Sequence, residues 1–188
     1  RAYSVTRALL RVMLVATTAI AATAIMLIPM YMEFVSGGQY RGYEHVFALF
    51  VWTAPSLGLL AFAQEALVAM GRQRETVFIA IVMVICTFLG GVAFVPAFQT
   101  TGSVTSKVVA SVAGSITALF LLRSAMNKTL EWSFFLRAFA FIAATVAVVW
   151  GAQWTMQLGS ISAIIAALGV CSIVLGLATV MRFINRNE

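Results

Sequence analysis

Long runs of apolar residues, separated by short polar turns, set the pattern of this chain. The first run without a charged residue covers 21 positions, from Val12 to Met32. A helix rises about 1.5 Å per residue, so this run is long enough to cross the roughly 30 Å hydrocarbon core of a bilayer. The apolar runs are continuous and lack the alternation of a half-buried β-strand, which favours transmembrane helices over a barrel.

Later runs repeat this format of apolar span and short turn. The longest, from Ala138 to Met181, has 44 residues without a charge. As one helix it would extend about 66 Å, twice what a bilayer requires, so we expect the chain to fold back at the polar stretch 153–160. The pattern predicts an all-α membrane protein with one transmembrane domain over residues 1–188 and six helices, at about 9–34, 43–70, 76–97, 104–123, 132–153 and 161–182.

The three prolines fall inside or at the ends of these apolar spans. Pro29, near the end of the first span, predicts a kink or a helix end. Pro55, near the centre of the second, frees a backbone carbonyl that a neighbouring helix or water must satisfy. Pro96 and the polar residues 99–103 are expected to close the third span.

Composition and charge agree with a membrane location. Hydrophobic residues make up 62% of the chain and charged residues only 10%, whereas a soluble domain carries about 25% charge. With six spans, ten basic residues fall on one side and two, Arg41 and Lys107, on the other. The positive-inside rule then places both termini in the cytoplasm, with the spans in an inner or plasma membrane. The net charge of +6 therefore reflects topology and not nucleic-acid binding. The ten residues are Arg1, Arg7, Arg11, Arg72, Arg74, Arg123, Lys128, Arg137, Arg182 and Arg186.

Few residues have the chemistry of a catalytic or metal site. The chain has no Asp, and its one His, His45, stands beside Glu44 at the outer end of a span. Cys86 and Cys171 lie singly in separate apolar runs, as packing residues do. No nucleophile with a base and no metal-ligand spacing is visible. We therefore expect no enzymatic activity, no catalytic residue, no metal and no cofactor.

Four residues are candidates for the gate or cavity wall of a transport path: Gln64, Glu65, Arg137 and Pro55. Glu65 should lie about 12 Å from the bilayer midplane, and Arg72, seven residues on, should share its helical face. Arg137 can extend back to the headgroups from the fifth span. The alternative interpretation is interfacial anchoring and an ion pair that fixes helix packing.

The stretch Leu27–Glu75 resembles the polysaccharide-exporter branch of the multidrug/oligosaccharidyl-lipid/polysaccharide (MOP) flippase superfamily. The similar features are Pro29 at a span end, the turn Gly37-Gly38-Gln39-Tyr40, the long span 43–70, and the closing sequence 69–72, Ala-Met-Gly-Arg. Gln39 stands where the family usually has an acidic residue. The resemblance implies a MOP/MATE-like transporter of which this chain is the C-terminal lobe. The start at Arg1, without a signal-peptide pattern, is consistent with a missing N-terminal lobe.

This resemblance further implies that a lipid-linked oligosaccharide or polysaccharide precursor is flipped across the cytoplasmic membrane by alternating access. The expected partners are that glycan, membrane lipids and the N-terminal lobe. Three alternatives remain: a multidrug-type exporter of the same superfamily, the membrane part of a polytopic glycosyl- or acyltransferase, and a complete six-span scaffold protein. The substrate sugar, the coupling ion and the oligomeric state are not indicated by the sequence.

Overall fold

The predicted all-helical fold class is confirmed by a computed structural model, which describes residues 2–37, 39–40, 42–126, 132–155 and 160–180. These residues contain helices and no strand. The helices are α1 (Ala2–Ser36), α2 (Glu44–Val51), α3 (Thr53–Ala69), α4 (Gln73–Ala125), α5 (Trp132–Thr155) and α6 (Ser160–Val180).

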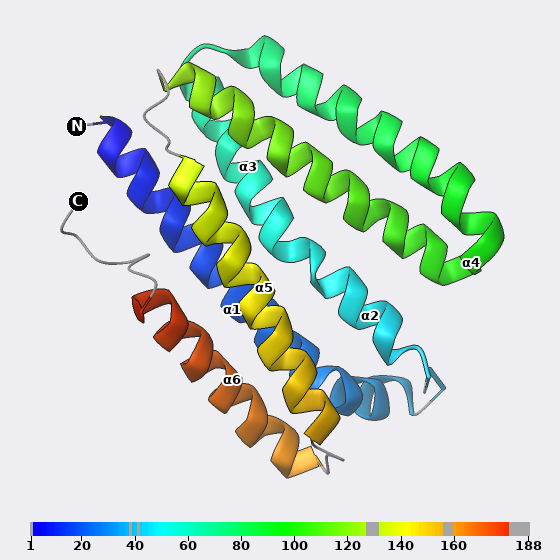
Figure 1. The fold of residues 1–188 in the computed structure, drawn as a ribbon. Coiled ribbons are helices and arrows are strands. Elements are labelled where there is room, and N and C mark those ends of the chain that lie inside the picture. Colours follow the sequence, from blue (N-terminus) through cyan, green and yellow to red (C-terminus); the bar gives the residue numbers. More distant parts are fainter. Residues whose placement is uncertain (1, 38, 41, 127–131, 156–159, 181–188) are drawn as a thin grey trace.

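Helix α1 occupies the centre of the described structure (Figure 1). Its backbone comes close to α2 and α3 on one side and to α5 and α6 on the other. In the part of the chain that the structure describes, α4 approaches only α2 and α3. Four large side chains of α1 are at most 1% exposed, so this helix lies at the centre of the hydrophobic core. They are Leu10, Leu14, Ile25 and Met26.

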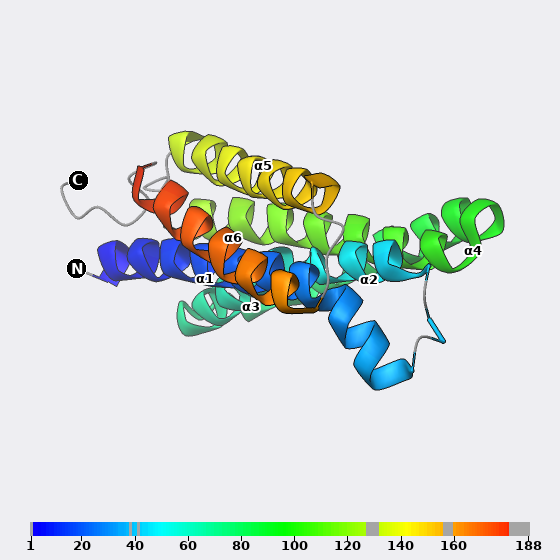
Figure 2. The ribbon, with the colours of Figure 1, turned by 90° about the horizontal axis from the view of Figure 1, so that it is seen from below.

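The last turns of α1 bend away from the bundle (Figure 2). The helix continues through Pro29 to Ser36 without ending. Proline removes one backbone hydrogen bond and its ring pushes against the preceding turn, which is the usual cause of such a kink. The segment beyond the bend exposes Tyr31, Phe34 and Val35.

The second apolar stretch consists of two short helices with a break at Trp52. Trp52 ends α2, where its N–H donates to the carbonyl of Ala48 at 3.1 Å, and α3 begins at Thr53. Pro55 lies in the first turn of α3 and has no N–H for the carbonyl of Val51. The break therefore falls on the N-terminal side of the proline, where the backbone hydrogen bond to the carbonyl of Val51 is missing.

Gly71 ends α3 and lets the chain turn directly into α4. Its φ of +76° is a backbone conformation that residues other than glycine rarely adopt. The N–H of Gly71 donates to the carbonyl of Val68, and that of Arg72 to the carbonyl of Leu67, both at 2.9 Å. This pair of bonds is a Schellman motif, which uses up the free carbonyls at the helix end.

Helix α4 is a hairpin of two antiparallel rods that meet at Gln99. The backbone of Gln99 is non-helical, with φ of 49° and ψ of −121°, and the helix resumes at once on its far side. Pro96 and the polar residues 99–103 were expected to close the third span, and the first rod does end at Gln99. The helix passes through Pro96 without ending, and residues 100–103 already belong to the second rod. They are helical because the second rod has to begin immediately in order to pack against the first.

Glycines permit this close approach of the two rods. A β-carbon on Gly102 would overlap the carbonyl oxygen of Phe94, and one on Gly90 would lie 2.9 Å from Cβ of Ser106. A stripe of small buried residues, one in every fourth position, runs along the second rod, as in close-packed membrane helices. The stripe consists of Gly102, Ser106, Ala110, Gly114 and Ala118.

Three helical segments of the described chain are long and apolar enough to cross a membrane: Ala8–Val35, Glu44–Ala69 and Gln73–Ala125, the last being the α4 hairpin. Two shorter apolar segments, Leu136–Gly151 and Ala167–Gly176, occupy the places of the fifth and sixth expected spans. The expected fold-back at 153–160 falls partly on residues 156–159, outside the described residues. The six-span count therefore stays a prediction, while a multi-pass apolar architecture is confirmed.

Candidate functional site

Basic residues gather at one end of the helix bundle. The start of α1, the end of α3, both ends of α4 and the start of α5 lie at this end (Figure 1). The arginines of these segments whose side chains the structure describes are Arg11, Arg72, Arg74, Arg123 and Arg137. The opposite end holds the turn at Gln99 and the end of α1. This separation is the geometry that the positive-inside rule requires.

We predict that the turn at Arg72 and the turn at Gln99 are reached from opposite sides of the membrane. In a variant with Cys86 and Cys171 replaced by alanine, a single cysteine at Gln73 should react with an impermeant maleimide only after the cells are opened. A cysteine at Thr100 should react in intact cells. Equal labelling of both positions in intact cells would contradict the arrangement.

An ion pair of Arg72 with Glu65, which a shared helical face would permit, is not formed. Arg72 Nε lies 2.8 Å from an Oε of Glu75, an ion pair within the first turn of α4. The spacing of seven residues does not keep Arg72 on the face of Glu65, because α3 ends at Ala69 and the turn at Gly71 redirects the backbone. The second carboxylate oxygen of Glu75 is buried. The ion pair therefore lies at the junction between α3 and α4, and not on the exposed face of α3.

The four candidate gate residues do not converge on one site. Pro55 is buried at the start of α3, Gln64 is half-buried and Glu65 is exposed near its end. Arg137 is exposed on α5. Helix α1 lies between α3 and α5 (Figure 2), and the backbones of α3 and α5 do not come close in the described chain.

Ser115, which the sequence analysis missed, donates a hydrogen bond from α4 to α3. Its Oγ lies 2.6 Å from the carbonyl oxygen of Ser56 and 2.7 Å from that of Ser111 in its own helix. Ser56 directly follows Pro55, but the carbonyl that lacks an N–H partner because of the proline is that of Val51, so this bond does not supply the donor that was expected for it. The small residues next to it in the second rod, Ser111 and Gly114, were the available signal. By contrast, the hydroxyls of Thr17, Thr18 and Thr23 bond within α1.

Replacing Ser115 by alanine should weaken the contact between α3 and α4 by about 0.5–1.5 kcal/mol, the usual worth of an interhelical hydrogen bond in a membrane. The midpoint of SDS-induced unfolding in mixed micelles measures this change. Ser172→Ala is the control, because the Ser172 hydroxyl bonds to Leu168 in its own exposed turn. An equal effect of the two substitutions would exclude a special role for the Ser115 bond.

Glu44 and His45 lie at the start of α2, at the end of the bundle that holds the Gln99 turn. Glu44 accepts a hydrogen bond from the N–H of Gly42 at 2.7 Å, which closes the turn before α2, and His45 is exposed. Within the described residues, no group of three or more His, Cys, Asp or Glu side chains is placed to hold a metal ion. The expected absence of enzymatic activity and of a cofactor stays a prediction.

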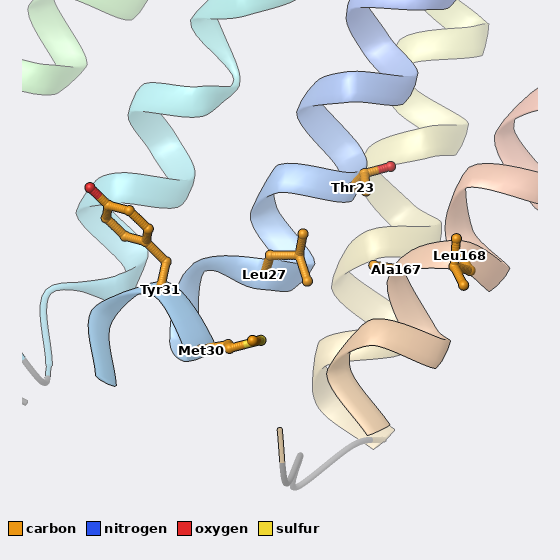
Figure 3. A pocket seen from close by; sticks show the side chains of 6 residues that line it. All are labelled: Thr23, Leu27, Met30, Tyr31, Ala167 and Leu168. Carbon is orange, nitrogen blue, oxygen red and sulfur yellow. The ribbon is translucent and has the colours of Figure 1, made fainter. Parts of the chain in front are cut away.

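An apolar groove of about 370 Å³ lies between α1 and α6 (Figure 3). Four residues of α1 and two of α6 line it. The hydroxyl of Thr23 is bonded to the carbonyl of Ala19 at 2.8 Å. The lining therefore offers carbon, sulfur and aromatic surface and no charge. The lining residues are Thr23, Leu27, Met30, Tyr31, Ala167 and Leu168.

The three long apolar helices and the separated charges define this chain as a multi-pass membrane protein. Comparisons with protein-family models, with curated proteins and with solved structures find no match. Any narrower assignment therefore depends on the arrangement of the chain's own residues.

Proposed function

We propose that this chain is the C-terminal lobe of a MOP-superfamily flippase of the polysaccharide-exporter branch. It would carry a lipid-linked oligosaccharide or polysaccharide precursor across the cytoplasmic membrane by alternating access, with both termini in the cytoplasm. The observation that carries the proposal is the stretch Leu27–Glu75. A kinked span, a Gly-Tyr turn, a long interrupted span and a glycine-capped basic turn follow one another there, as in that family.

The polar headgroup of the proposed substrate requires a protein path through the membrane. A sugar–pyrophosphate headgroup cannot cross hydrocarbon bare, since each unpaired polar group costs several kcal/mol. A helical lobe supplies one wall of a polar path, while the lipid tail stays in the bilayer. The described spans hold no cation at their centres, so the residues that bind the phosphates would come from the N-terminal lobe.

Gln64 and Glu65 are the residues of α3 that we assign to the wall of this path. They stand near the basic end of the helix, and Glu65 is exposed, so its carboxylate is available to a facing lobe. Arg137, exposed near the start of α5, is assigned to the same path at a place separate from Gln64 and Glu65. Glu65→Gln and Arg137→Gln should reduce transport without loss of the protein from the membrane.

Deletion of the full-length gene tests the function. The expected result is a loss of surface glycan together with lipid-linked repeat units trapped on the cytoplasmic leaflet. Reintroduction of the intact protein should restore both. Unchanged surface glycan with increased sensitivity to cationic dyes would favour a multidrug exporter. Loss of the lipid-linked unit itself would favour the membrane part of a transferase.

A further inference from the structure

We propose that Lys107 forms a binding site for a lipid phosphate, where the seam between the second rod of α4 and its neighbours opens toward the end opposite the basic residues. The proposal goes beyond the transport function, because it concerns an anion held by this hairpin and no passage through the protein. Lys107 is exposed within the α4 hairpin. An ionisable side chain inside a membrane span is costly to keep without an anion, so such residues mark binding sites and polar paths.

The depth of Lys107 places its ammonium group within reach of lipid headgroups. The first rod, residues 73–98, is about 39 Å long, so a hairpin centred on the bilayer extends about 4–5 Å beyond a roughly 30 Å core at each end. Lys107 follows the turn at Gln99 by two helical turns, or about 12 Å, which puts its backbone roughly 7–8 Å inside the hydrocarbon. A lysine at this depth extends its stem along the rod until its ammonium group meets the phosphates of that leaflet.

The face of the second rod that carries Lys107 is the face that packs on α3. Ser111 and Ala118 follow Lys107 on this face and are at most 3% exposed. Ser115, beside them, donates its hydrogen bond to the carbonyl of Ser56 in α3. Lys107 stands one turn before Ser111 and is exposed, so the seam is closed on the side of Ser111 and opens at Lys107.

The break at Trp52 explains where the seam opens. The second rod of α4 and the stretch of α2 and α3 both run toward the basic end (Figure 1), and the bond between Ser115 and Ser56 fixes their register. Counting back equally from these two serines places Lys107 level with Ala48 of α2. The break at Trp52 lies between the two levels, so α3 covers the rod after Lys107, whereas α2 leaves Lys107 itself exposed.

Two hydroxyl groups extend the set of donors at Lys107 toward the membrane surface. Ser103 and Thr100 precede Lys107 by one and two turns on the same helical face. The hydroxyls of their neighbours Thr105 and Ser106 bond to carbonyls of the same rod at 2.8 and 2.9 Å. In the described chain, the hydroxyls of Ser103 and Thr100 donate no such bond. An ammonium group with two hydroxyl donors suits an anion with several acceptor oxygens, and phosphate is the anion that every phospholipid brings to this depth.

The charge of Lys107 is available to such a ligand. Within the described residues, no ion pair joins Lys107 to a carboxylate. Glu44, at the start of the neighbouring helix α2, accepts a hydrogen bond from the N–H of Gly42 at 2.7 Å. The lysine and the two hydroxyls therefore face the headgroup layer as a set of donors for an acceptor from outside the described chain.

Photocrosslinking of the full-length protein tests the site. The vesicles consist of digalactosyldiacylglycerol, a bilayer lipid without phosphate, and a small fraction of phosphatidylglycerol with a diazirine on its headgroup. Mass spectrometry maps the labelled residues, and we expect label on residues 100–107. Lys107→Gln should lower this label about tenfold, as for the loss of a hydrogen bond to a charged group, and Lys107→Arg should retain it. Unchanged label around Arg74, at the basic end, reports that each variant is folded in the bilayer.

A relocated lysine separates a site from simple extension of a lysine toward the headgroups. The double variant Lys107→Gln, Val109→Lys moves the cation by two residues, to the outer face of the rod, where Val109 is 44% exposed. This variant should not restore the label anywhere between residues 100 and 112. Full restoration, label that Lys107→Gln leaves unchanged, or no label on residues 100–107 in the unsubstituted protein would overturn the proposal.

Two competitors identify the source of the phosphate. Displacement of the label by excess unlabelled phosphatidylglycerol, and not by trace polyprenyl diphosphate, assigns the site to a bilayer phospholipid. Displacement by trace polyprenyl diphosphate assigns it to the phosphate of a carrier lipid, and both results support the site. Displacement by diacylglycerol, which has no phosphate, would refute it. The vesicles contain no lipid-linked glycan, so failure of the site leaves the flippase proposal untouched.

Discussion

Substitution of Gly102 by alanine is expected to destabilise the α4 hairpin by about 3 kcal/mol, at the upper end of the usual cost of overpacking. The new β-carbon would overlap the carbonyl oxygen of Phe94 and would lie 2.9 Å from the backbone nitrogen of Val95. These are backbone atoms in the facing rod, which cannot rotate away as a side chain can. The two rods would have to separate next to the turn at Gln99, where the chain has no spare length.

Gly91→Ala is the matched control, since a β-carbon there meets nothing within 4 Å. It should be neutral or should stabilise the helix by up to about 1 kcal/mol, the intrinsic preference for alanine over glycine. Gly114→Ala should fall between the two, because the obstacle is the flexible side chain of Met83. SDS-induced unfolding of the purified protein in mixed micelles ranks the three variants. A Gly102→Ala variant as stable as Gly91→Ala would refute the tight hairpin.

Phe141→Ala is expected to cost about 3–5 kcal/mol, the usual range for truncation of a buried aromatic side chain. Phe141 is among the largest side chains with no exposed surface, and its helix, α5, packs on α1 and α6. Membrane helices associate chiefly through van der Waals packing, so a cavity here removes the attraction itself. The midpoint of SDS-induced unfolding in mixed micelles should therefore move to a lower SDS fraction than in the unsubstituted protein, because α5 separates from α1 more readily.

Phe139→Ala controls for the chemistry of the substitution. Phe139 is two residues away on the same helix and is 75% exposed. Its truncation removes the same atoms without leaving a cavity, so its effect on unfolding should stay within about 0.5 kcal/mol. Similar midpoints for the two variants would mean that α5 is not held against α1 as the structure has it.

Much of the architecture could be predicted from hydrophobic pattern because span length is a local property. The helical class followed from apolar runs without alternation, and the disturbance at Pro55 from the missing N–H of proline. The kink at Pro29 has the same origin, although the helix continues beyond it to Ser36. These features depend on residues close together in sequence, whose covalent chemistry fixes the outcome.

Features that depend on packing between helices were not predicted. Residues 99–103 have the composition of a loop, yet all but Gln99 are helical, since the small-residue stripe of the second rod draws it against the first. Arg72 was assigned to the face of Glu65 because periodicity carries no information about the helix end at Ala69. The candidate residues Gln64, Glu65 and Arg137 came from side-chain chemistry alone, and convergence of side chains is a tertiary property.

The central place of α1 has a mechanical consequence. In the described chain, the group formed by α2, α3 and α4 and the group formed by α5 and α6 approach one another's backbones only by way of α1. Rotation of one group relative to the other about α1 would therefore leave most of the packing inside each group intact. It would disturb only the two interfaces that α1 forms, one with each group.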